Sequence, residues 1–183
     1  STSDPTTHTV LRAPTTLELT GPTSSTYRET VTFTATISAT TGDLDGTVSF
    51  SDGSDAIACD AAPTITGSGP TWTATCSTAD LTAGVHAISA TYSGGANYTG
   101  SASTGEIAVA QAPTTLELTG PTSSTYRETV TFTATISATT GDLDGTVSFS
   151  DGTEPIAACQ GVTVSAGTTS PWTATCSKIG RAH

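Results

Sequence analysis

The four cysteines are the residues whose spacing most directly predicts chemistry. The separation between Cys59 and Cys76 recurs unchanged between Cys159 and Cys176. Four cysteines allow three pairings, and the repeated spacing favours Cys59 with Cys76 and Cys159 with Cys176. A zinc site would instead need clustered ligands such as CxxC, and the sequence has none. Two disulfides are therefore predicted, and they indicate an oxidising, extracellular compartment.

Aspartates gather in one turn-rich stretch and raise the question of a metal site. They are Asp43, Asp45, Asp52, Asp55 and Asp60. Calcium takes carboxylate oxygens, so Asp43, Asp45 and Asp52 are candidate ligands, but the run Asp-Leu-Asp-Gly lacks the closing Glu of an EF-hand loop. Solvated turn carboxylates are the main interpretation, and a calcium site is the alternative. No other cofactor is expected.

Catalytic chemistry has few candidate residues. A serine nucleophile needs a base, and His86 is the only histidine between residues 13 and 111, where it alternates in phase with Ile88. No GxSxG elbow occurs. Trp72 and Trp172 also alternate with small buried residues, which favours core packing over stacking on a sugar. We therefore expect no enzyme, and a hydrolase is a distant alternative.

The elements that would position these residues are short strands. Between residues 30 and 38 Val31, Phe33, Ala35 and Ile37 alternate with Thr and Ser, as a half-buried antiparallel strand requires. Glycine, proline and aspartate turns separate similar segments. Strands are predicted at residues 30–38, 47–51, 56–59, 71–77, 86–92 and 106–111, and the core at Val31, Phe33, Ile37, Val48, Phe50, Trp72, Ile88 and Val109. This pattern predicts an all-β, Greek-key sandwich.

An internal repeat organises the chain. Residues 13–53 recur letter for letter at residues 112–152. Residues 1–12 match the end of the first copy, and we expect them to be the last strand of a preceding repeat or a linker. Residues 13–111 then form a complete module, and residues 112–177 an incomplete second one.

The last six residues match nothing in the first copy. Residues 178–183 resemble a translated sequencing-adapter stem, so we expect a non-native tail and a gene assembled from environmental, metagenomic reads. Lys178, the only lysine, lies in it, which excludes a Lys–Asn isopeptide bond within residues 13–111.

The module resembles a known family. The runs TVTFTAT at residues 30–36, GTVSF at 46–50 and LTAGVHAISATYSGGANY at 81–98 are similar to the bacterial Ig-like domain of group 3. The resemblance implies an immunoglobulin-like sandwich that occurs in tandem in secreted and cell-surface proteins and separates a functional head from the cell envelope. Gly95 stands where the family signature has Asp, and the cysteine pair is not part of the common pattern.

Charge excludes two classes of partner. The net charge is −11, and the five basic residues are scattered singly along 183 residues. Nucleic acids and anionic membranes are both bound through Lys and Arg, so neither is expected, and no apolar run is long enough for membrane insertion.

Two functions remain in contention. The first is a structural spacer or stalk of an adhesin-like surface protein, because near-identical repeats suit a role in which length matters; its partners are the neighbouring repeats. The second is a module that binds a glycan or a host surface protein through its end loops. A second module without its closing strands should also fray or self-associate head to tail, with residues 7–12 of another copy as the donor strand.

Overall fold

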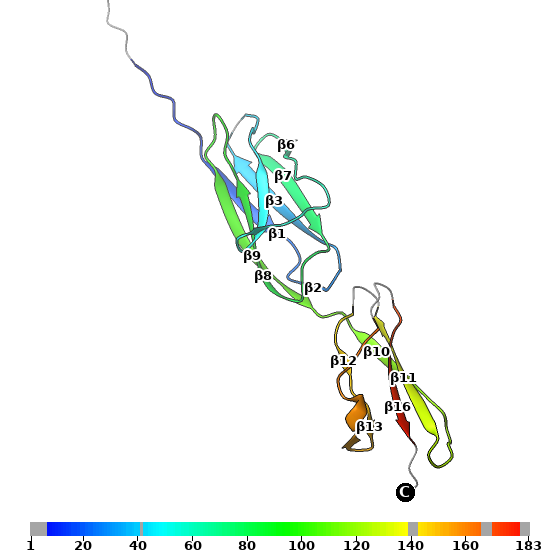
Figure 1. Cartoon of the computed structure of the whole chain (residues 1–183). Helices are drawn as coiled ribbons and strands as arrows, with labels where there is room; N and C mark the ends of the chain where they lie inside the picture. Colours follow the sequence, from blue (N-terminus) through cyan, green and yellow to red (C-terminus); the bar gives the residue numbers. More distant parts are fainter. Residues whose placement is uncertain (1–6, 41, 139–142, 166–169, 180–183) are drawn as a thin grey trace, which may run out of the picture. The chain divides into compact units, whose positions relative to one another are not determined.

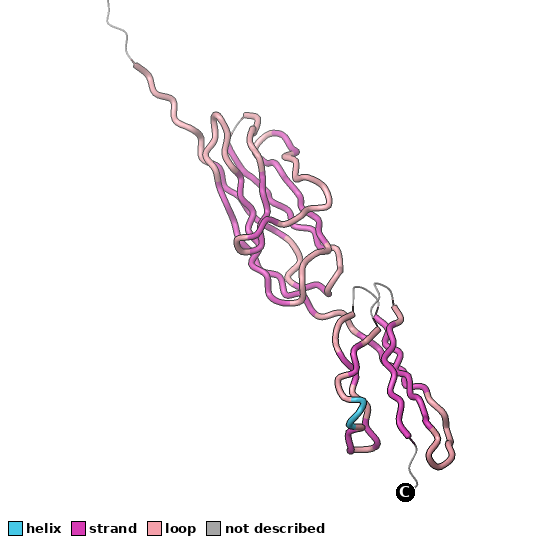
Figure 2. Tube along the Cα trace, in the orientation of Figure 1, coloured by secondary structure: helices cyan, strands magenta, loops and turns pink. Residues whose placement is uncertain are grey.

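The computed structural model describes residues 7–40, 42–138, 143–165 and 170–179, and it divides into two compact units, Ser1–Ala110 and Gln111–His183. Strands dominate both units, and a single short helical turn occurs in the described residues (Figures 1 and 2). The fold is all-β, as predicted from the alternating pattern.

The first sheet of unit 1 is antiparallel and has the order β1-β3-β7-β6. Its strands are β1 (Thr15–Thr20), β3 (Val31–Ala39), β7 (Thr71–Thr78) and β6 (Thr66–Ser68). Each of the long strands β3 and β7 alternates buried apolar residues with Thr or Ser, so that one face of the sheet is apolar and the other is polar.

The second sheet of unit 1 has the order β2-β9-β8-β4-β5. Its strands are β2 (Ser24–Thr26), β9 (Ser101–Ala110), β8 (Gly84–Tyr92), β4 (Val48–Asp52) and β5 (Asp55–Ala56). The chain changes sheet between β1 and β2, between β2 and β3, between β3 and β4, between β5 and β6, and between β7 and β8. These crossings give the Greek-key arrangement of an immunoglobulin-like sandwich.

The core of unit 1 lies between the two sheets and confirms the sequence prediction. All eight predicted core residues are less than 9% exposed, and they belong to one apolar cluster. The predicted strands are present, with ends displaced by a few residues, except at residues 56–59.

The predicted strand at residues 56–59 is wrong. Only Asp55 and Ala56 pair with β4, and Ile57 makes one further backbone hydrogen bond to Phe50 before the chain leaves the sheet. The chain must leave there because Cys59 is bonded to Cys76 on β7, in the opposite sheet. Sequence alternation cannot show that a segment changes sheet.

The three-stranded sheet of unit 2 is antiparallel and has the order β10-β11-β16. Its strands are β10 (Thr114–Thr119), β11 (Thr129–Ala138) and β16 (Trp172–Ile179). The strand β16 includes Lys178 and Ile179, because both residues continue the pairing with β11. These two residues were expected to lie in a non-native tail.

Smaller elements complete the described part of unit 2. Two short pairs are formed by β12 (Thr146–Val147) with β15 (Val162–Thr163), and by β13 (Ser150–Asp151) with β14 (Glu154–Pro155). The turn η1 (Ala157–Cys159) follows β14. Buried residues from β11, β16, η1 and Phe149 form the core of this unit.

The first two long strands of each repeat pair in the same way in the two units. Leu17 pairs with Ile37 in unit 1, and Leu116 pairs with Ile136 in unit 2, in the same register. Burial nevertheless differs, because Leu17 is packed on the core whereas Leu116 is 58% exposed. In unit 1 β9 runs beside β1, and the described residues of unit 2 include no strand in that place.

Candidate functional site

The Cys59–Cys76 disulfide ties two parts of unit 1 together, as the repeated spacing predicts. Cys76 is fully buried on β7, and Cys59 lies in the segment that crosses between the sheets, with 5.1 Å between the two Cα atoms. The backbone N–H of Asp60 donates to the Ser77 carbonyl at 2.8 Å, which fixes the crossing segment against β7. The bond is structural, since Cys76 is out of reach of solvent.

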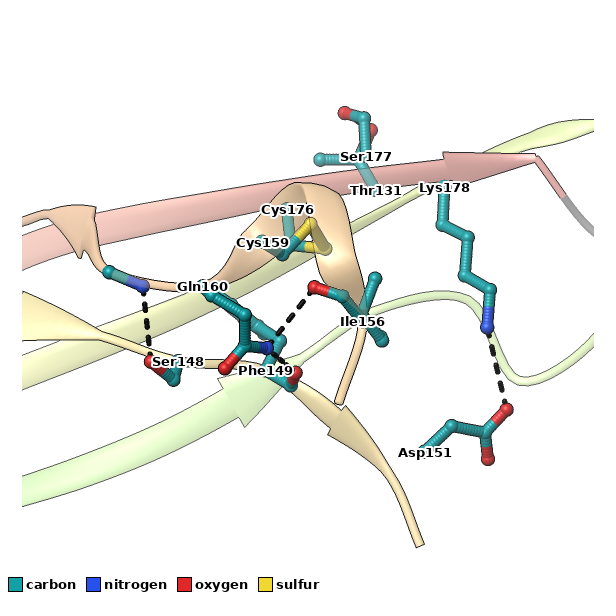
Figure 3. The surroundings of a disulfide bond; sticks show 11 residues. Thr131, Ser148, Phe149, Asp151, Ile156, Cys159, Gln160, Cys176, Ser177 and Lys178 are labelled. Carbon is teal, nitrogen blue, oxygen red and sulfur yellow. Dashed lines mark hydrogen bonds and ion pairs between the residues drawn. A yellow bond between two sulfur atoms is a disulfide. The ribbon is translucent and has the colours of Figure 1, made fainter. Parts of the chain in front are cut away.

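The Cys159–Cys176 disulfide occupies the corresponding place in unit 2 (Figure 3). Beside it, the Gln160 side-chain amide donates to the Phe149 carbonyl at 2.7 Å and to the Ile156 carbonyl at 3.1 Å. These bonds hold η1 on the chain that leads into β13, so that Cys159 faces β16. Gln160 was not predicted, because unit 1 has Asp60 at the equivalent place.

His86 forms a polar link at one end of the unit 1 sandwich. Its Nδ1 lies 2.5 Å from Oδ2 of Asp52, and its Nε2 lies 2.8 Å from the Thr82 carbonyl. The hydrogen bond to Asp52 and then that to Thr82 raise the pKa of His86 above 6.5, against the opposing effect of burial. Both ring nitrogens face acceptors, so the imidazolium form satisfies both bonds.

The geometry around His86 fits packing and pairing rather than base catalysis. A general base needs a free acceptor nitrogen, and both nitrogens here point at oxygen atoms within the protein. The side chain is 11% exposed. The sequence places His86 in phase with Ile88, but it does not identify Asp52 as the partner.

Asp45 organises the loop at the other end of β8. Its side-chain Oδ2 accepts the N–H of Ala96 at 2.9 Å, and its carbonyl accepts the Tyr92 hydroxyl at 2.5 Å. Burial, and secondarily the Asp45 charge, raise the pKa of Tyr92, so it remains a donor at physiological pH. A β-carbon on Gly95 would overlap the Asp45 carboxylate. Asp45 thus fills the space in which a side chain at position 95 would lie.

The calcium candidates are engaged separately. Asp43 is exposed in the loop before β4, Asp45 holds the Ala96 amide, and Asp52 is bonded to His86. Within the described ranges no three His, Cys, Asp or Glu side chains come close enough together to hold a metal ion. The structure therefore brings no calcium ligand set together at these three residues.

The tryptophans are buried, and the outer face of the sheet is lined by hydroxyl side chains. Trp72 and Trp172 are 3% and 2% exposed, as expected for core residues. On the outer face Thr32 and Ser77 share a hydrogen bond at 2.8 Å, and unit 2 repeats it between the equivalent residues at 2.9 Å. Among the described residues Tyr126 is the one strongly exposed aromatic side chain.

The fold and the disulfide together define unit 1 as an immunoglobulin-like β-sandwich module with an inter-sheet disulfide. The family model of the bacterial Ig-like domain (group 3) matches residues 17–110. The chain belongs to this family. No match was found among curated proteins. In the described part of the chain, no helix has the length and apolar character needed to cross a membrane.

Proposed function

We propose that the chain is a non-catalytic structural spacer of a secreted or cell-surface bacterial protein, built from tandem Ig-like modules. The observation that carries the proposal is that one stretch of sequence occurs twice in the chain. Residues 13–53 and 112–152 are identical, and the ladder between β1 and β3 recurs in the same register between β10 and β11. Duplication of a whole strand pattern lengthens a protein without changing its chemistry.

The surface supports a spacer more than a binding module. Sugar-binding sites usually present aromatic rings for stacking, and both tryptophans are buried. The outer faces of β3 and β7 instead carry Thr and Ser, and Thr32 and Ser77 hydrogen-bond to each other there. An acidic chain with a net charge of −11 also remains well solvated at high local density.

The two disulfides support the proposed location. They join the segment after β5 to β7 in unit 1, and the segment after β14 to β16 in unit 2. Such bonds persist outside the cytoplasm and not within it. An adhesin-like surface protein is the setting that agrees with them, and the protein that these modules extend would carry the recognition or anchoring function.

Scattering measurements on lengthened chains test the proposal. One or two further copies of residues 13–111 would be inserted after residue 111, and small-angle X-ray scattering would measure the maximum dimension of each chain. A spacer should lengthen by a constant increment for each copy. A maximum dimension that does not grow would contradict the proposal, and saturable binding of a glycan by the unaltered chain would favour the binding module.

A further inference from the structure

In the described part of unit 2 one edge is uncovered, although its counterpart in unit 1 is covered. Tyr27 and Tyr126 stand in identical sequences, yet Tyr27 is packed on the core of unit 1 and Tyr126 is 65% exposed. The difference extends inward, since Phe33 is fully buried and its twin Phe132 is only partly buried. The same residues are therefore covered in unit 1 and exposed in unit 2.

Unit 1 shows what covers this edge. The three residues of β2 pair in parallel with Ala108, Val109 and Ala110 of β9. The N–H of Ala108 donates to the Thr23 carbonyl at 3.0 Å, and the N–H of Tyr27 donates to the Ala110 carbonyl at 2.8 Å. Val109 points into the core and is 5% exposed. The occupant of the edge is thus a parallel strand in which Val109 is the buried residue opposite β2, with the buried Ile107 two residues before it.

The receiving turn is already formed in unit 2. Arg127 has a backbone φ of 68°, and its twin Arg28 has a φ of 67°. The N–H of Glu128 donates to the Thr125 carbonyl at 3.0 Å. The Glu128 side chain in turn accepts the N–H of Thr125 at 2.7 Å. This bond from the Thr125 backbone, and a second from its hydroxyl, lower the pKa of Glu128. A strand that docks here would not have to order the turn.

The chain itself carries a segment that matches the part of β9 that pairs with β2. Residues 8–13 align with residues 107–112, where the repeat places Val10 at the position of Val109. Residues 7–12 form no strand in unit 1, and Val10 and Leu11 are 83% and 84% exposed. Two strongly exposed aliphatic side chains in a row are uncommon on a chain with so few apolar residues.

We propose that residues 7–12 of one copy dock as a parallel strand on residues 123–125 of a second copy. In the register of unit 1, Val10 lies opposite Ser124 and enters the space between Tyr126 and the core of unit 2, while Leu11 points outward as Ala110 does. The N–H of Tyr126 donates to the Leu11 carbonyl, and the N–H of Thr9 donates to the Thr122 carbonyl. Each copy offers one donor and one acceptor, so association is head to tail.

The proposal does not depend on the spacer function, and a matched pair of variants tests it. Sedimentation equilibrium of the whole chain over a concentration series should show self-association. Val10→Asp should weaken it about tenfold or more, because the carboxylate would be buried without a partner. Leu11→Asp should leave it nearly unchanged. Both substitutions lie outside the core of unit 1, so the folding of that unit provides an internal control.

Two further measurements fix the register. A mixture of chains carrying Val10→Cys and Ser124→Cys should cross-link under oxidising conditions, and a mixture of Val10→Cys with Ser177→Cys, on the outer face of β16, should not. The Tyr126 amide should gain protection from hydrogen exchange as concentration rises. A chain that stays monomeric throughout the series overturns the proposal. Equal loss of association in the two aspartate variants, or cross-linking to position 177, also overturns it.

Discussion

Nδ1 of His86 lies 2.5 Å from Oδ2 of Asp52, and this contact joins the start of β8 to the end of β4. The two residues are 34 positions apart in the chain. Since His86 also donates to the Thr82 carbonyl, one side chain holds two strands and the turn that precedes one of them. Folding of this corner of unit 1 is therefore linked to protonation of His86.

The stability of unit 1 should depend on pH through His86. Its pKa is raised in the folded state above the ordinary 6.5, so the folded state binds the proton more tightly. The stabilisation is complete below about pH 6.5 and is lost as pH rises through the higher folded pKa. Hydrogen exchange of β3 amides from pH 5 to 9 should show this loss, and His86→Gln should flatten it and cost about 2 kcal/mol at pH 5.

A control for this pH dependence is built into the sequence. His8 lies in an exposed segment, so His8→Gln should leave the profile of the unaltered chain intact. If His86→Gln and the unaltered chain lose stability in parallel across this range, the pair with Asp52 does not cause the pH dependence.

Twin leucines should differ in their contribution to stability. The N–H of Leu19 approaches the Ser103 hydroxyl on β9 at 3.4 Å, and its side chain packs on the core, whereas Leu118 is 58% exposed. Leu19→Ala should destabilise unit 1 by about 2 kcal/mol, and Leu118→Ala should change unit 2 by less than about 0.5 kcal/mol. Hydrogen exchange of β3 and β11 amides in dilute solution measures the two effects separately. Equal costs would show that the two faces are equally covered.

Gly95 and Asp45 should behave as a pair. Gly95→Asp would bring a second carboxylate onto that of Asp45 and disturb its bond to the Ala96 amide, at a cost of about 2 kcal/mol. Adding Asp45→Gly should recover much of that loss, because one carboxylate then remains to hold the loop. Thermal unfolding of the single and double variants tests this. A double variant less stable than either single variant would contradict it.

Removing the disulfide should have a larger effect on the folding of unit 2 than on that of unit 1. Replacing Cys59 and Cys76 by Ala should lower the stability of unit 1 by about 3 kcal/mol and leave it folded, since a large core remains. The same change at Cys159 and Cys176 should unfold unit 2, whose buried cluster is much smaller. Limited proteolysis would then cut the second variant beyond residue 112 first. Unchanged resistance of that region would show that the strand pairing suffices without the bond.

Sequence could predict what depends on alternation and duplication. Phe33 and Trp72 stand in strands with a strict period of two, and the cysteine pairing follows from a repeated spacing. It could not predict β2 and β6, which have no apolar side chain and therefore show no alternation of apolar and polar residues. Nor could it pair His86 with Asp52 or Tyr92 with Asp45, because such contacts depend on which strands become neighbours.

The parallel course of the first and last segments of unit 1 has a mechanical consequence. Ala13 forms a parallel bridge with Tyr98, and β2 pairs in parallel with β9. The first and the last segments of the module therefore run in the same direction. A tensile force that pulls the two chain ends apart therefore loads these hydrogen bonds along the strands and all at once. A hairpin pulled at its open end would instead release its bonds one after another. The module should thus resist stretching until the whole group of bonds shears together.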